Sequence, residues 1–273
     1  MSEYQIRIGA VPDLCCRPIV YGLEQPGSPA SAGLFFESSG VNTERILNGE
    51  CDAALIGPIE YARNSSDFIL SPSVGVSSRG ENRTILLSIN KDIRKIASVA
   101  VGVVSSSDIV LAKIILSEKF EQEIAIVPVI GSIDQMLSKA DAAVVAGNAA
   151  LVSEWSGPKL DLVDEWTDMT DLPFVHLLCA ARKEKLSDEI AALLQSSQAL
   201  GVESIPIIAL QQSMQLSVPA IQAEQQLERY SYGFDGESRE ALGEFFRYAF
   251  YHGILPDVPE IDVFGDTNTA GNI

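Results

Sequence analysis

Residues 46–56 read ILNGECDAALI, and residues 136–145 read MLSKADAAVV. Each stretch is typical of the end of a helix, a tight turn, an aspartate and then a buried strand. The two aspartates, Asp52 and Asp141, lie 89 residues apart, which is about the length of one small α/β lobe. This repeat predicts two similar lobes, although two unrelated segments can also share so common a local unit.

The rest of the chain fits an α/β protein, because short apolar runs alternate with amphipathic stretches. Such a pattern is typical of parallel strands joined by helices, and ligands of open α/β sheets bind beyond the carboxyl ends of the strands. Two lobes whose strand ends face each other would form a cleft that can close over a small molecule. We predict strands at 4–10, 53–56, 83–90, 99–104, 142–146 and 174–181, helices at 18–23 and 109–119, and mostly helical structure over 187–251.

Composition narrows the classes of function. The 273 residues include 37 acidic and 19 basic side chains, for a net charge of −18, which disfavours nucleic-acid binding. No apolar run approaches the length of a membrane span, and the amino terminus shows no export pattern, so we expect a cytoplasmic protein. Four cysteines and two histidines, without a Cys-x-x-Cys pair, predict neither a disulfide framework nor a zinc site.

The strongest local signal for a ligand is a serine turn. Ser105, Ser106 and Ser107 follow a predicted strand and open a predicted helix, where free N–H groups and the helix dipole favour a carboxylate or phosphate. The alternative is that Ser107 or Asp108 simply caps the helix. Asp108 also adds negative charge close to the expected anion.

Other candidates follow strand ends. Cys15 lies near the amino end of the helix that Pro18 begins, where a thiol can become reactive, although most such cysteines are small buried hydrophobes. Arg17 could pair with a ligand carboxylate or be a solvated surface charge. Gly57 would let the backbone approach a ligand, and the following Glu60 would line a cleft or begin a helix.

Three further residues could contact a ligand. Thr84, in the polar turn that contains Arg79 and Arg83, could supply a hydroxyl, and the amide of Asn148 could contact an anion. His176 lies inside an apolar strand, where a core histidine is commoner than a catalytic base. From the residues alone, the sequence predicts a two-lobed protein that binds a small carboxylate.

Longer stretches occur in the same order as in a known family. Their shared order over residues 4–264 resembles the chorismate dehydratase family of the futalosine route to menaquinone, which is related to dihydroxynaphthoate synthase. The stretches are 18–23 (PIVYGL), 52–56 (DAALI), 59–64 (IEYARN), 141–147 (DAAVVAG), 165–167 (EWT), 172–175 (LPFV), 180–182 (AAR) and 245–249 (FFRYA).

The resemblance implies a two-lobed, periplasmic-binding-protein-like type II fold, with mixed sheets flanked by helices and the ligand cleft between the lobes. Residues 1–91 and 182–273 would form the first lobe and residues 92–181 the second. It also implies a lyase that removes water from chorismate to give 3-enolpyruvylbenzoate, with no metal or organic cofactor. Such an enzyme must hold carboxylates and place a proton acceptor.

Several positions depart from the family pattern. Cys15 stands where the family usually has an asparagine with a catalytic or positioning role, and a thiol cannot replace the paired donor and acceptor of an amide. Thr84 replaces a serine, and the resemblance places Cys15 and Thr84 at catalytic positions. It assigns substrate contacts to Ser105, Ser106, Ser107, Asn148 and Gly57. In the family, aspartate is common at the position of Asn148, a serine pair stands in place of Gly57-Pro58, and a small hydroxyl residue stands in place of Asp108.

Two hypotheses follow. The first is a lyase acting on chorismate or a similar cyclic carboxylate, and the second is a non-catalytic protein that binds a small carboxylate in an altered pocket. In both, the partner is a small molecule rather than a nucleic acid or a membrane, and the oligomeric state is left open.

Overall fold

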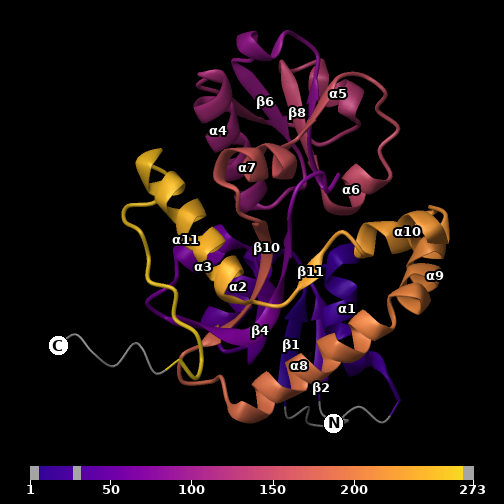
Figure 1. The fold of residues 1–273 in the computed structure, drawn as a ribbon, viewed down its shortest axis with the longest axis vertical. Coiled ribbons are helices and arrows are strands. Elements are labelled where there is room, and N and C mark those ends of the chain that lie inside the picture. The colour runs from indigo at the N-terminus through magenta and orange to yellow at the C-terminus, as the bar shows by residue number, and fades with distance from the viewer. Residues whose placement is uncertain (1–5, 27–31, 267–273) are drawn as a thin grey trace.

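The computed structural model describes residues 6–26 and 32–266, which form two β-sheets with helices around them. The larger sheet and its helices, here called the first lobe, lie in the lower part of Figure 1. Its strand order is β11 (Ser231–Tyr232), β4 (Phe68–Ser78), β10 (Phe174–Arg182), β3 (Ala53–Ile56), β1 (Ile6–Ala10) and β2 (Ala32–Phe36). Tyr4 and Gln5, at the start of the predicted first strand, lie outside the described residues.

The smaller sheet and its helices form the second lobe, in the upper part of Figure 1. Its strand order is β7 (Ala125–Pro128), β6 (Ser98–Val101), β8 (Ala142–Ala146), β5 (Ile85–Ile89) and β9 (Lys159–Asp161). The two sheets, together with the helices between their strands, confirm the predicted α/β class.

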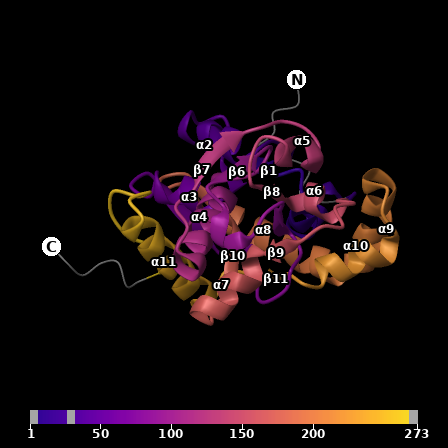
Figure 2. The same ribbon diagram turned by 90° about the horizontal axis from the view of Figure 1, so that it is seen from above.

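Helices surround both sheets. α8 runs along the base of the first lobe, α9 and α10 project to one side of the molecule, and α11 lies on the opposite side (Figures 1 and 2). The α-helices are α1 (Arg17–Val20), α2 (Ser39–Leu47), α3 (Pro58–Ala62), α4 (Ser106–Phe120), α5 (Ile133–Leu137), α6 (Gly147–Leu151), α7 (Leu162–Thr170), α8 (Asp188–Glu203), α9 (Ile205–Leu216), α10 (Ala220–Leu227) and α11 (Gly236–Tyr251), and the short 3-10 helices are η1 (Leu14–Cys16), η2 (Tyr21–Glu24) and η3 (Ile93–Lys95).

The repeated sequence corresponds to a repeated topology. β1 pairs in parallel with β2 and β3, and β6 pairs in parallel with β7 and β8. In each lobe an aspartate after the helix fastens the start of the first strand: Asp52 accepts a hydrogen bond from the Arg7 N–H (2.7 Å), and Asp141 accepts one from the Ser98 N–H (3.2 Å). The prediction of two similar lobes is therefore confirmed.

The boundaries between the lobes differ from the predicted ones, because each sheet includes one strand that follows a crossing from the other lobe. β5, which we placed in the first lobe, lies between β8 and β9 of the second. β10, which we placed almost wholly in the second lobe, lies between β4 and β3 of the first. Both strands run antiparallel to their neighbours, so pairing places the crossings near residues 79–84 and 171–173 rather than at 91 and 182.

One hydrophobic core joins the lobes on the side of α11. It includes Leu87 and Val144 of the smaller sheet as well as Ile56 and Phe68 of the larger one. At its centre, the buried ring of Trp166 on α7 meets several aromatic rings edge-on, including Phe174 of β10 at 6.2 Å and Phe245 of α11 at 5.8 Å between centroids. Aromatic pairs of this geometry add to the stabilisation from buried area, so they fix the lobes together on this side.

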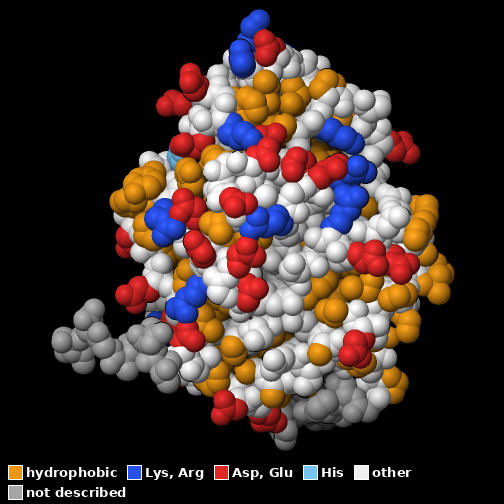
Figure 3. All heavy atoms as spheres, in the orientation of Figure 1, with side chains coloured by type: hydrophobic (Ala, Val, Ile, Leu, Met, Phe, Trp, Pro, Cys, Tyr) orange, Lys and Arg blue, Asp and Glu red, His pale blue; other side chains and the backbone are white. Residues whose placement is uncertain are grey.

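The opposite side presents a different surface. Hydrophobic side chains gather along the right-hand edge of Figure 3, over α9 and α10, where Leu210 and Met214 are 60% and 76% exposed. Among the described residues, no single helix is long and apolar enough to span a membrane. Only α8 and α9 taken together meet that criterion, and the pair is bent by 82°.

Candidate functional site

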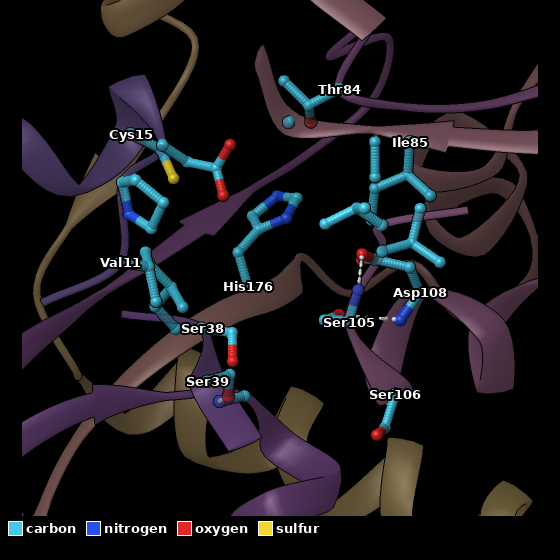
Figure 4. Close-up of a pocket in the computed structure, with 18 of the residues that line it drawn as sticks. Val11, Cys15, Ser38, Ser39, Thr84, Ile85, Ser105, Ser106, Asp108 and His176 are labelled. Atoms are coloured by element: carbon cyan, nitrogen blue, oxygen red, sulfur yellow. Dashed lines mark hydrogen bonds between the residues drawn. The ribbon is translucent and has the colours of Figure 1, made fainter. Parts of the chain in front are cut away.

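A cavity of about 520 Å³ lies between the lobes. Figure 4 shows Cys15, Ser38 and Ser39 of the first lobe on one side, Thr84, Ser105 and Asp108 on the other, and His176 between them. The remaining lining residues are Val11, Pro12, Asp13, Gly40, Gly57, Glu60, Ile85, Val103, Val104, Ser106, Ala146, Gly147, Ala149, Leu177 and Tyr230. A cavity of this size holds a molecule of one ring with its substituents.

The serine turn reaches this cavity as predicted, at the amino end of α4. Ser105 is the N-cap, and its hydroxyl accepts a hydrogen bond from the Asp108 N–H (3.1 Å) while the Asp108 carboxylate accepts one from the Ser105 N–H (2.9 Å). This reciprocal capping box occupies the N–H groups of Ser105 and Asp108, which could otherwise donate to a bound anion. The N–H groups of Ser106 and Ser107 have no acceptor within the helix. Of these two residues, Ser106 lines the cavity, so its N–H remains for a ligand.

The side chain of Ser107 does not line the cavity. It is 1% exposed, and its hydroxyl accepts a hydrogen bond from the Ile59 N–H at 3.1 Å. This contact joins α4 of the second lobe to α3 of the first. The predicted ligand contact of this hydroxyl is therefore replaced by a contact between the lobes.

Cys15 and Thr84, the residues at the implied catalytic positions, both line the cavity. Burial raises the pKa of the Cys15 thiol well above its usual value, so this group is protonated and does not serve as a base. The Thr84 hydroxyl donates to the side-chain oxygen of Asn82 and interacts with the Tyr230 hydroxyl. Because the Thr84 hydroxyl already donates its proton to Asn82, Thr84 can accept a hydrogen bond from a ligand but cannot donate one.

Gly57 lines the cavity, but its lack of a side chain leaves room for neighbouring protein groups rather than for a ligand. A side chain at this position would begin 2.6 Å from Oε2 of Glu60 and 2.9 Å from the Ser107 hydroxyl. The Gly57 N–H donates to the Ser39 hydroxyl at 2.7 Å. The absence of a Cβ at Gly57 therefore lets α3 and α4 meet, and it brings the Glu60 carboxylate close to the serine turn.

Asn148 fastens the lobes together beside the cavity rather than lining it. Its side-chain oxygen accepts from the Leu14 N–H (2.9 Å), its amide nitrogen donates to the Pro12 carbonyl (3.1 Å), and its backbone N–H donates to the Asp13 carboxylate (3.0 Å). Gly147 makes this approach possible, since its φ is +58° and a Cβ there would lie 2.3 Å from the same carboxylate. The amide we expected to contact a ligand is used to hold the lobes closed.

All the charged side chains that line the cavity are acidic: Asp13, Glu60 and Asp108. Burial raises the pKa of Asp108 to about 6; the nearby carboxylates of Asp13 and Glu60 contribute to this increase, and hydrogen bonds with Ser105 oppose it. Burial also raises the pKa of Asp13, against the opposing effect of its hydrogen bond from Asn148. At least one cavity carboxyl thus exchanges its proton close to neutral pH.

His176 borders the cavity as a neutral ring. Burial lowers its pKa to about 3, its Nε2 lies 2.7 Å from the Ser78 hydroxyl, and its ring meets Phe174 and Tyr230 edge-on. These contacts are those of a core histidine, the commoner alternative at this position, and they leave it unsuited to act as a base.

The structure agrees with the alternatives in which Arg17 and the arginines of the polar turn do not contact a ligand. Arg17 lies 4.3 Å from the centre of the Phe36 ring and does not reach the cavity. Arg79 pairs with Asp171 and Glu237, and Arg83 pairs with Glu81 at the same surface turn.

Sequence reasoning assigned no role to Asp13, Ser38 or Tyr230. Asp13 follows the carboxyl end of β1, and its position after a predicted strand could have identified it as a candidate ligand contact. Ser38 follows β2, which was not predicted, and Tyr230 comes from the helical region far along the chain. Only the folded chain brings the last two to the cavity.

A second hollow of about 750 Å³ adjoins the cavity in the second lobe, and Val103, Val104, Ala146 and Ala149 line both. In residues 6–26 and 32–266, no three His, Cys, Asp or Glu side chains are placed to hold one metal ion.

Two lobes of matching topology, crossed twice by the chain and separated by a ligand-sized cavity, define the class of periplasmic-binding-protein-like folds. Several solved structures resemble the chain in fold. Protein AF1704 from Archaeoglobus fulgidus is 18% identical with a TM-score of 0.73, over 93% of this chain and all of that one. The periplasmic aliphatic sulphonate binding protein SsuA from Escherichia coli is 16% identical with a TM-score of 0.65, over 94% and 90% of the two chains.

Sequence comparison identifies the family. The model of the menaquinone biosynthesis family matches residues 6–251, which is nearly the whole chain, so this protein belongs to that family. The resemblance found in the sequence is thereby confirmed.

Proposed function

We propose that this chain is a lyase that removes water from chorismate, or from a closely similar cyclic carboxylate, in the cavity between its lobes. The observation that supports this function is that the amino end of α4 and the carboxyl groups of Asp13 and Asp108, whose pKa values are raised, lie in one cavity. The free N–H group of Ser106 suits a ligand carboxylate, and Asp108 suits proton transfer. Membership of the menaquinone biosynthesis family supports the same reaction class.

The proposed reaction needs one proton to move. The C–H bond beside the enolpyruvyl ether breaks, its electron pair enters the ring, and the bond between the ring and the neighbouring hydroxyl breaks. Asp108 accepts the ring proton as a carboxylate and returns it to the departing hydroxide, which leaves as water. Atoms and charge balance without an oxidant, and the aromatic product drives the step.

Closure of the lobes contributes in a second way. The contacts of Asn148 with Pro12 and Leu14 keep the cavity walls in place. Because the walls are fixed, less entropy is lost when the substrate ring is positioned against the Asp108 carboxyl. Thr84 accepts a hydrogen bond from the ring hydroxyl in this arrangement, which orients the leaving group.

One observation favours the second hypothesis, a non-catalytic binding protein. Cys15 occupies the position at which the family resemblance implies an asparagine, and its protonated thiol cannot both donate to and accept from a substrate as an amide does. The two hypotheses therefore differ in what the substitution of Cys15 will do.

The experiment is to incubate the purified protein with chorismate and to follow loss of one water by mass spectrometry. The Cys15→Asn variant should turn over chorismate faster than the original protein, because the amide restores a donor and an acceptor at the cavity wall. Cys15→Ser is the matched control, since it adds a hydroxyl without the amide.

An unchanged or lower rate in Cys15→Asn would argue against the proposed site. Binding of chorismate by calorimetry, with no turnover in any variant, would favour the binding protein instead.

A further inference from the structure

We infer that the protein forms a symmetric dimer through an uncharged surface of α9 and α10, and that the partner on this surface is a second copy of the same chain. The surface consists of the exposed side chains of α9, α10 and the turn between them, within residues 204–223, and is here called the α9–α10 face. The inference goes beyond the proposed function, because this face lies outside the cavity between the lobes.

The sequence of the α9–α10 face differs in charge from the rest of the chain. Residues 204–223 contain no Asp, Glu, Lys or Arg, although these residue types make up 21% of the protein and would place about four members in a stretch of 20. An exposed helix of a water-soluble protein normally carries charged residues on its outer face. The uncharged surface of these two helices is therefore not typical of one that stays in water.

α9 is apolar on two opposite faces. Its inner face, which includes Ile208 and Ala209, is buried against the protein. Its outer face carries Ile207, Leu210 and Met214, which are 51%, 60% and 76% exposed. Their spacing of i, i+3 and i+7 places them in one stripe along the helix. Because a helix that is apolar all round is normally buried all round, the outer stripe indicates a surface that a partner covers.

The α9–α10 face is also extensive. Nine of residues 204–223 are exposed and five more are partly exposed, and hydrophobic side chains gather over both helices in Figure 3. Ile221 of α10 is 59% exposed, while Leu200 and Val202 at the end of α8 are 42% and 40% exposed. One side of a standard protein interface uses about 20 to 30 residues, with charged residues depleted at its centre. The face and the adjoining end of α8 approach that size and have that composition.

Charge identifies the partner as a second copy of the chain. In a symmetric dimer the same patch lies on both sides, so a patch with net charge would meet the same charge on its partner. Each copy has a net charge of −18, and most of its surface would repel an identical surface. The α9–α10 face avoids this repulsion because it carries no charge. A basic protein partner would instead favour an acidic part of the surface.

A membrane would be a different cover for the same helices, since α8 and α9 together meet the length and composition of a span. Helices that lie on membranes carry Lys or Arg on their polar face, and anionic headgroups repel acidic proteins. α9 contains neither Lys nor Arg. These observations favour a second copy over a membrane, and vesicle binding is an outcome of the test.

Sedimentation equilibrium of the full chain measures the association. We expect a species of twice the monomer mass at micromolar protein concentrations. Its dissociation constant should decrease when NaCl is raised from about 50 to about 500 mM, because salt screens the repulsion between two acidic copies. A monomer at every concentration, or a dimer that salt weakens, would overturn the inference.

Two opposite substitutions test the α9–α10 face. Met214→Glu and Met214→Lys should each raise the dissociation constant at least about tenfold, because each charge then meets its own kind across the symmetric interface. An equimolar mixture of the two variants should form a dimer again, since opposite charges face each other. Tyr251→Glu is the matched control, because Tyr251 of α11 is also 76% exposed, and it should change the dissociation constant by less than about twofold.

An unchanged dissociation constant in both Met214 variants, or dissociation in Tyr251→Glu as well, would overturn the role of this face. Flotation with phosphatidylglycerol vesicles should leave the original protein unbound. Vesicle binding that Met214→Glu abolishes would overturn the inference in favour of a membrane. None of these measurements involves the cavity between the lobes, so their failure would leave the proposed function intact.

Discussion

Asp108 serves both the stability of α4 and the chemistry of the cavity. Its backbone N–H and its carboxylate complete the capping box with Ser105, while the same carboxylate lines the cavity and has a pKa raised to about 6 by burial. A capping acid is usually solvent-exposed and ionised. Here the cost of burial makes the cap sensitive to pH.

Replacement of Asp108 by Asn should change how stability depends on pH. The folded pKa lies above the unfolded value of about 3.9, so this group's contribution to stability is full below about pH 4 and is lost as the pH rises through 6. The free energy of unfolding of the original protein should therefore fall by about 2 kcal/mol more than that of Asp108→Asn between pH 4.5 and 7.5.

Urea unfolding at the two pH values measures this difference. Asp134→Asn provides the control, because Asp134 occupies the first turn of α5 but is exposed. If Asp108→Asn and the original protein lose stability in parallel, the carboxyl does not titrate as stated.

The roles of Gly57 and Ser107 show what a sequence can reveal about single residues. Their places, after a strand and at a helix start, could be predicted from turn and capping preferences. Their partners could not, because the Ser107 hydroxyl binds the Ile59 N–H of the other lobe, 48 residues away in sequence. The same holds for Glu60, whose proximity to the serine turn depends on that contact.

Among the elements, strands with unbroken apolar runs were the predictable ones. β3 and β8 have the predicted bounds, 53–56 and 142–146, because both lie buried in the middle of a sheet. β4 was not predicted, since Phe68–Ser78 contains Pro72 and Gly75 among serines. Its pairing with β10, which includes two register shifts, stabilises a strand that its own residues do not favour.

The capping boxes of α4 and α5 offer a comparison between equivalent helix starts. Ser105→Ala and Ser132→Ala should each cost about 1 kcal/mol of stability, because each removes the side-chain acceptor of an N-cap. Only Ser105→Ala should also weaken binding of a cyclic carboxylate, by about two- to fivefold, since the start of α4 lines the cavity between the lobes.

Thermal unfolding and calorimetric titration of the two variants test this prediction. An equal loss of affinity in both would show that stability, rather than the geometry of the serine turn, governs binding.

For the whole molecule, the two-lobed plan could be predicted from the repeat, whereas the assignment of β5 and β10 could not. Sequence order places β5 beside β4 and β10 beside β9, but each strand pairs in the lobe that the chain enters after a crossing: β5 with β8 and β9, and β10 with β3 and β4. The contacts that fasten the lobes, such as those of Asn148, join residues more than 130 positions apart and leave no local pattern.

Asn148→Ala should loosen the closed arrangement of the lobes. It removes two side-chain hydrogen bonds across the cavity edge, which together stabilise closure by about 2 kcal/mol. Hydrogen exchange at the Leu14 amide should become faster, and small-angle scattering should give a larger radius of gyration. Asn90→Ala is the control, since Asn90 bonds within the second lobe; similar exchange in the two variants would contradict the role of Asn148.

The core beneath α11 has a consequence for cooperativity. Because Trp166, Phe174 and Phe245 pack together from both lobes, neither lobe keeps a complete apolar interior when the other unfolds. Denaturation curves from circular dichroism and tryptophan fluorescence should therefore coincide in a single transition, and two separate midpoints would disprove this coupling. Any motion that admits a ligand is accordingly a small rotation about this fixed seam rather than a free swing of independent domains.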